Sequence, residues 1–311
     1  MRRLTHILVL ATPLLLAGCG ASQEKPTAQD DAAWDQAMTA GRDSFELGRY
    51  TVAVSQYRKA ANLALVRDDG TAVAEAGYDL AVSQLAANTP AEALQTTQAT
   101  RQAVQLRGAQ DMSSLDLVEA ASHYRLGHYA QAVTFAGRAM RAADVAVAAR
   151  AALVMGLAAD AQADQGALQA AGAYLSALKP PLSLTQQADR AEIQARVLRQ
   201  SNPALAEQRA EEAADLRQSE GAYHDMARAL ALAARIAASQ GDQAKARTLW
   251  ARAAQSAAAQ SGALNRMDAQ TLAHGNLTKG DAVPPADDAQ AWARNAGNIE
   301  LTPFAENPRA P

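Results

Sequence analysis

Cys19 is the residue whose sequence context most clearly predicts a chemical role. It is the only cysteine among 311 residues, and it directly follows the small residues Ala17 and Gly18. Two arginines stand near the start of the chain, and an apolar stretch covers residues 4–16. A basic start, a short apolar stretch and small residues before a cleavage point are typical of a secretory signal. The stretch is shorter than the roughly 20 residues that span a bilayer, so the sequence predicts export and removal of residues 1–18.

The run Leu16-Ala17-Gly18-Cys19 resembles the lipobox of bacterial lipoproteins. The resemblance implies cleavage before Cys19, attachment of lipid (palmitate among the acyl chains) to the protein there, and a membrane-anchored mature chain. Gly20 rather than aspartate follows, which by resemblance to sorting signals of this class implies the periplasmic face of the outer membrane. Ordinary signal cleavage without a lipid is the alternative. Residues 19–31 are polar and contain proline, as expected of a flexible tether.

The other reactive side chains do not group into a catalytic or metal-binding pattern. No histidine is followed three or four residues later by a ligand-type partner. His123 and His128 flank a predicted turn, so their side chains are expected to diverge. A single cysteine excludes a thiolate zinc site, a CxxC pair and an internal disulfide. The sequence also lacks a GxSxG elbow and a glycine-rich phosphate loop. We therefore expect a protein that is not an enzyme and uses no cofactor or metal.

Composition narrows the fold class and the partners. The formal net charge is −3, which gives no bulk attraction to nucleic acid. Apolar residues make up 49% of the chain but aromatic residues only 4%. Alanine supplies much of the apolar fraction, and alanine is the strongest helix former. An alanine-rich, aromatic-poor chain predicts an all-α protein with closely packed helices.

Residues that interrupt helices recur at a regular spacing through the predicted helical domain, residues 32–262. Successive interruptions are 36 to 40 residues apart, at Gly48, Asn88, Gly127, Gln165, Ser201 and Gly241. A period of this size is the signature of a repeat architecture. It predicts an α-solenoid of about six helix-turn-helix repeats.

Small residues recur after each interruption. Positions 5, 9 and 12 residues later lie on one helical face, and residues such as Ala53, Ala132 and Ala246 occupy them. Small side chains let paired helices approach closely, so we expect these positions to be buried. In the fourth unit the same offsets select Ala170, Tyr174 and Ala177. Capping boxes are predicted at the helix starts 89–92 and 183–186.

The pattern resembles the tetratricopeptide repeat (TPR). Residues 47–54, 126–133 and 240–246 carry the resemblance best, each with a glycine followed by alternating small residues. Such repeats usually contain about 34 residues, and the longer unit here places extra residues in loops. The alternative is an alanine-rich helical bundle without repeats.

The resemblance implies a concave groove lined by the first helix of each pair, where a protein partner binds. Aromatic and arginine side chains are enriched at such interfaces. Offsets from each turn select the candidate groove residues Arg42, Phe45, Tyr78, Leu85, Tyr124, Arg125, Arg199, Arg228 and Arg235. The alternative is that several of them pack between repeats.

The C-terminal region, residues 263–311, loses the repeat pattern. Its large apolar residues are few, and they include Leu301. Its composition predicts a largely disordered tail, and the alternative is a segment that docks onto a groove, including the protein's own.

Together these features predict a non-enzymatic, lipid-anchored scaffold or adaptor in the periplasm. It would bind proteins through its groove during envelope assembly or secretion. The alternatives are an accessory protein for polysaccharide or small-molecule export, and an envelope hydrolase.

Overall fold

The computed structural model describes residues 31–108, 112–260 and 301–303. The signal segment, Cys19 and most of the predicted tether lie outside the described residues, so lipidation of Cys19 stays a prediction. Most of the predicted tail also lies outside them, except for Leu301, Thr302 and Pro303.

Within the described residues the protein is all-α, with twelve helices and no strand. The helices are α1 (Ala32–Glu46), α2 (Tyr50–Val66), α3 (Gly70–Ala86), α4 (Pro90–Gln105), α5 (Ser113–Arg125), α6 (Tyr129–Ala139), α7 (Val145–Ala161), α8 (Gln165–Ala177), α9 (Leu184–Leu198), α10 (Pro203–Glu220), α11 (Tyr223–Ser239) and α12 (Gln243–Gln260).

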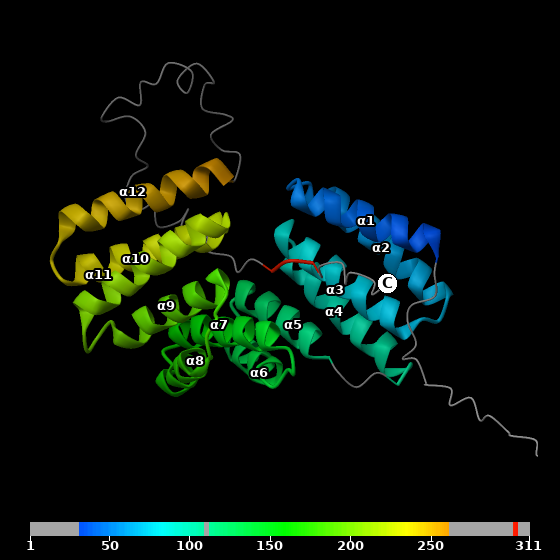
Figure 1. Ribbon diagram of the computed structural model, residues 1–311, viewed down its shortest axis with the longest axis horizontal. Helices are drawn as coiled ribbons and strands as arrows, with labels where there is room; N and C mark the ends of the chain where they lie inside the picture. Colours follow the sequence, from blue (N-terminus) through cyan, green and yellow to red (C-terminus); the bar gives the residue numbers. More distant parts are fainter. Residues whose placement is uncertain (1–30, 109–111, 261–300, 304–311) are drawn as a thin grey trace, which may run out of the picture.

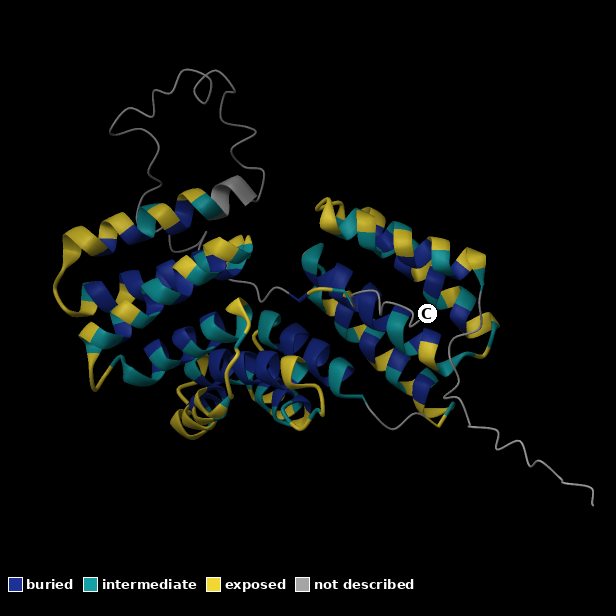
Figure 2. Cartoon of the chain, in the orientation of Figure 1, coloured by how far each residue is buried: buried dark blue, intermediate teal, exposed yellow. Residues whose placement is uncertain are grey.

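Each helix packs against the next one along the chain, which makes a helical solenoid. Figure 1 shows the helix pairs following a curved path, with α1 and α2 at one end and α11 and α12 at the other. Helices α5 and α7 lie on the inner side of the curve, and α6 and α8 lie outside them. Figure 2 shows the buried residues concentrated between the helices and on α5 and α7.

The predicted burial of the small residues is confirmed in five of the six units. Ala53 and Ala132 are completely buried, and Ala246 is 3% exposed. Equivalent residues of the second and fifth units are also buried, at 93, 97, 100, 206, 210 and 213. Small side chains at these positions bring the two helices of a pair into close contact, as the spacing predicts.

The fourth unit differs from the prediction by two residues. Gln165 is the first residue of α8 and not the turn, which is formed instead around Ala163 with φ of 60°. Counting from Ala163, the inward positions are Leu168, Gly172 and Leu175, which are buried. The predicted positions Ala170 and Ala177 are exposed and Tyr174 is half-buried, so the predicted register of this unit is wrong. The reason is that alanine rarely adopts positive φ, and residue type therefore gave no signal for the turn.

Four of the other five turns are made by residues suited to a left-handed conformation, and the turn at Ser201 is the exception. Gly48, Gly127 and Gly241 have φ of 69°, 75° and 87°, and Asn88 has φ of 65°. Glycine and asparagine adopt these values at little cost. The breakers that define the repeat period therefore end one helix and reverse the chain into its partner.

One of the two predicted capping boxes is present. Ser183 accepts a hydrogen bond from the backbone N–H of Gln186, and the Gln186 side chain accepts one from the backbone N–H of Ser183. Thr89 does not cap its helix, because its hydroxyl donates instead to the carbonyl oxygen of Gln84 in the preceding helix, at 3.1 Å. Among the described helices, none combines the length and apolar character required to cross a lipid bilayer.

Candidate binding cleft

A cleft of about 970 Å³ opens on the inner side of the solenoid. Its walls come mainly from first helices of successive pairs, at Tyr78 of α3, Leu117 of α5, Arg150 of α7 and Asp189 of α9. The C-terminal end of α10 closes it with Arg217. The repeat places these residues together because equivalent positions of consecutive first helices face the same side of the superhelix.

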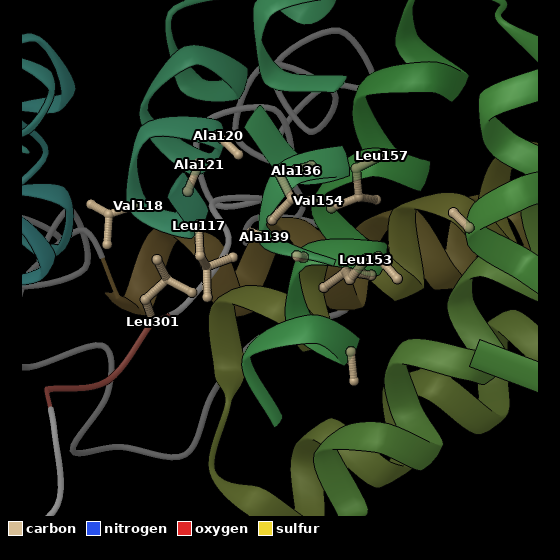
Figure 3. Packing of buried hydrophobic residues seen from close by; sticks show 14 of the residues in the cluster. Leu117, Val118, Ala120, Ala121, Ala136, Ala139, Leu153, Val154, Leu157 and Leu301 are labelled. Carbon is tan, nitrogen blue, oxygen red and sulfur yellow. The ribbon is translucent and has the colours of Figure 1, made fainter. Parts of the chain in front are cut away.

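The described part of the C-terminal region forms part of the wall of this cleft, at Leu301, Thr302 and Pro303. Leu301 is 8% exposed and belongs to the hydrophobic cluster that α3, α5 and α7 build. Figure 3 shows the Leu301 side chain beside Leu117 and Val118. The hydroxyl of Tyr78 donates a hydrogen bond to the carbonyl oxygen of Thr302 at 3.3 Å. Residues 301–303 therefore match the second alternative for the tail, a segment that docks onto the protein's own surface.

Tyr78 anchors this contact from the protein side. It is 7% exposed, and burial raises the pKa of its phenol, with the neighbouring Asp79 acting in the same direction. The phenol therefore stays protonated at physiological pH and remains a hydrogen-bond donor. A buried tyrosine with a directed hydroxyl gives the cleft one fixed polar contact within an apolar surface.

A network of buried ion pairs supports the deeper side of the cleft. Arg150 donates to Asp189 at 2.7 Å and to Asp225 at 2.5 Å, which ties α7 to α9 and α11. Arg217 of α10 also donates to Asp189. Arg228 donates to Asp225 at 2.6 Å. The first helices of three consecutive pairs, α7, α9 and α11, are thereby linked through buried ion pairs.

The network continues along the inner face through Glu192. This carboxylate accepts from Arg228 at 2.8 and 2.7 Å and from Arg196 at 2.8 Å. Arg196 also contacts Asp160 at 2.7 Å, and Arg199 contacts the same carboxylate at 2.9 Å. Burial alone would raise the pKa of Glu192, but Arg228 and Arg196 outweigh it and lower that pKa to about 2. Glu192 is thus ionised and is held in place by hydrogen bonds from the two arginines.

The apolar and aromatic candidates from the sequence lie in or beside the core. Leu85 is 2% exposed and Phe45 is partly buried, with its ring 5.1 Å from the ring of Tyr50. Tyr124 is partly buried against the same cluster as Leu301, and burial raises its pKa. Of this set, Tyr78 is the residue that lines the cleft and contacts the docked segment.

The arginine candidates divide according to their partners. Arg228 and Arg199 hold carboxylates of the ion-pair network. Arg125 donates to the carbonyl oxygen of Leu85 and, at 2.7 Å, to the side chain of Asn88, and burial lowers its pKa to about 10. Arg42 is half-buried near Glu75.

Arg235 is the remaining arginine candidate, and it lies at the surface of α11. Its nearby charges include those of Arg196 and Arg199. It does not line the cleft that holds residues 301–303.

The two central histidines lie together, contrary to the prediction that they diverge. The Nδ1 atoms of His123 and His128 are 3.4 Å apart and the ring centroids 5.6 Å apart. The turn at Gly127 has a left-handed residue, which folds the chain back and brings the two rings together. His123 also stacks on Phe135. Within the described residues, no group of three or more potential ligands is arranged to hold a metal ion.

The sequence contained a signal for the network that motif reasoning missed. The linked charges are 36 or 39 residues apart, as in Asp160 with Arg196, Glu192 with Arg228, and Arg150 with Asp189. This spacing equals one repeat. Opposite charges at equivalent positions of successive first helices would therefore have predicted the pairs.

Comparison with known proteins does not assign the chain to a family. No protein-family model matches the chain, and no curated protein matches it. The fold and the cleft are therefore the observations on which a function is built.

Proposed function

We propose that this protein is a non-enzymatic adaptor, anchored in the outer membrane by lipid on Cys19, that binds a segment of another envelope protein in its inner cleft. The anchor rests on the resemblance of residues 16–19 to a lipobox, and the mode of binding on the resemblance of the helix pairs to TPR units. Envelope assembly and secretion are the processes in which such an adaptor would act.

The observation that carries the proposal is the peptide segment already held on the inner side of the solenoid, where it forms one wall of the cleft. Residues 301–303 contribute one buried apolar side chain and one backbone carbonyl to the contact. Both are features that any polypeptide segment can offer. A surface that accepts a segment of its own chain in this way is chemically suited to accept one from a partner.

The rigidity of the cleft supports the same proposal. The ion pairs of Arg150, Arg217 and Arg228 link α7, α9, α10 and α11 before any partner arrives. A preorganised surface loses less conformational entropy on binding than a mobile one. The cleft is thus suited to reversible capture of a flexible segment.

The proposal is tested by filling the cleft with a bulky side chain. Ala146 is exposed and lines the cleft, whereas Ala170 is exposed on α8 and is not part of it. Tagged wild type, Ala146→Trp and Ala170→Trp would be used to capture proteins from solubilised envelopes. We expect a partner that is retained by wild type and Ala170→Trp and lost with Ala146→Trp. The same proteins retained by all three would contradict binding in the cleft.

A further inference from the structure

Residues 301–303 are separated from α12 by 40 residues of chain, yet Leu301 reaches the largest of the hydrophobic clusters that the described residues form. Its side chain is the only part of the segment that is deeply buried, because Thr302 is exposed and Pro303 is half-buried. Recognition therefore depends on one leucine-sized apolar side chain, followed by a carbonyl oxygen that accepts from Tyr78.

The charge around this apolar position is negative. The charged side chains that line the cleft are four carboxylates (Glu75, Asp144, Asp189 and Glu220) against two guanidiniums (Arg150 and Arg217), a formal charge of −2. Both guanidiniums already contact carboxylates of the ion-pair network. Burial raises the pKa of Glu75, with Arg42 acting against it, which means that a further positive charge in the cleft would stabilise the ionised carboxylate.

The resident segment does not match that charge. In the sequence, Glu300 directly precedes Leu301, and Glu306 follows five residues later. Neither glutamate supplies the positive charge that the cleft lacks. Attachment to the same chain compensates for this, since a tethered segment is present at an effective concentration on the order of millimolar.

We infer that the cleft recognises a segment of another protein in which a leucine-type side chain stands next to a basic residue, and that residues 301–303 occupy the cleft until such a segment displaces them. This inference rests on the proposed adaptor function and adds the chemistry of the partner. Compared with a basic segment of another protein, the tail has the less favourable charge, but it has the advantage of being attached to the same chain. Exchange therefore requires a partner that supplies the missing positive charge.

The test uses the whole mature chain without its lipid, residues 20–311, and two labelled peptides. One peptide has the sequence of residues 298–306, and the second has lysine in place of both glutamates. Binding is measured by fluorescence anisotropy to wild type, to Leu301→Asp, and to Thr302→Ala. Thr302→Ala is the matched control, because it keeps the carbonyl oxygen and changes an exposed side chain.

We expect both peptides to bind Leu301→Asp at least about tenfold more tightly than wild type, since the variant releases a buried leucine. Thr302→Ala should behave as wild type. The lysine peptide should bind Leu301→Asp more tightly than the native peptide, and the difference should shrink when salt is raised from about 50 mM to about 500 mM. Adding Tyr78→Phe to Leu301→Asp should weaken both peptides several-fold through loss of one hydrogen bond.

Each alternative result overturns a stated part of the inference. Equal binding to wild type and Leu301→Asp would show that the tail does not occupy the cleft. Equal affinity for the two peptides would remove the preference for a basic residue, and absence of binding to Leu301→Asp would remove the cleft as a recognition site. A wild-type chain that forms a dimer, and loses it in Leu301→Asp, would make the occupant the tail of a second copy. Because these assays use synthetic peptides, they are independent of whether the envelope capture experiment finds a partner.

Discussion

Replacement of Asp225 by asparagine should strongly destabilise the solenoid. The Asp225 side chain is fully buried, and it accepts hydrogen bonds from Arg150 at 2.5 Å and Arg228 at 2.6 Å. Arg217 lies 3.6 Å away. Asparagine has nearly the same volume, so the change removes a charge without creating a cavity. It leaves three buried guanidiniums facing a neutral amide whose N–H₂ group cannot accept from them.

The size of the effect follows from the burial. Breaking a buried ion pair by removing one partner costs about 3–5 kcal/mol. For a repeat domain of this length that corresponds to a fall of roughly 6–20 °C in melting temperature. The matched control is Glu212→Gln, since the side chains of the Arg209–Glu212 pair are 37% and 43% exposed. Such an exposed pair contributes about 0–1 kcal/mol.

The pH dependence gives a second signature of the same residue. Burial alone would raise the pKa of Asp225, but Arg150, Arg228 and Arg217 outweigh it and hold that pKa below its ordinary value. A depressed carboxyl pKa adds stability that is complete above the ordinary pKa and is lost as pH falls through the folded-state value. Urea unfolding followed by circular dichroism should therefore give a constant difference between wild type and Asp225→Asn from pH 5 to 8. The difference should shrink only in strong acid. A loss below about 1 kcal/mol at neutral pH would refute the role assigned to the network.

Three further predictions concern the packing, the histidine pair and the anchor. Gly77→Ala should lower the free energy of unfolding by about 1–3 kcal/mol, because the new Cβ would lie 2.3 Å from Thr100 Oγ1. Gly137→Ala, whose new Cβ would meet no atom within 4 Å, should raise it by up to about 1 kcal/mol. Equal urea midpoints for the two variants would contradict this packing. Burial and then the charge of His128 lower the pKa of His123, so the free energy of unfolding should fall as pH drops below about 6.5. His123→Phe should reduce this pH dependence, as measured by urea unfolding at several pH values. An unchanged pH dependence in the variant would show that another group is responsible. Cys19→Ser should abolish labelling by radioactive palmitate in cells, and a wild-type chain that takes up no label would contradict the lipid anchor.

The periodic part of the fold could be predicted from the sequence because it depends on local rules. Glycine and asparagine at the turns, and alanine at fixed offsets, each act within one helix pair. The prediction failed at Ala163 because an alanine at positive φ gives no signal in its residue type. The neighbouring Gln165 was interpreted as the helix interruption instead. Because the turn lies two residues earlier than predicted, the positions of α8 that were predicted to face inward lie on its exposed side.

The cleft could be predicted only in part, because its residues meet across repeats. Tyr78 was found because aromatic residues on first helices are natural candidates. The position of Leu301 could not be predicted, because no local pattern in the tail indicates which surface a segment beyond residues 261–300 contacts. The network arginines Arg150 and Arg217 were missed for a different reason: their significance depends on carboxylates 28 to 75 residues away, as with Asp189 and Asp225.

The central claim is that the inner cleft is where a partner binds, and site-specific photo-crosslinking in intact cells tests it most directly. Thr71 is exposed at the rim of the cleft, and Gln169 is exposed on α8 outside it. With a photoreactive amino acid at either position, we predict that Thr71 crosslinks to a distinct envelope protein. The yield should rise in the Leu301→Asp background, and Gln169 should give no such product. Crosslinking that is equal at the two positions, or present only at Gln169, would contradict the account.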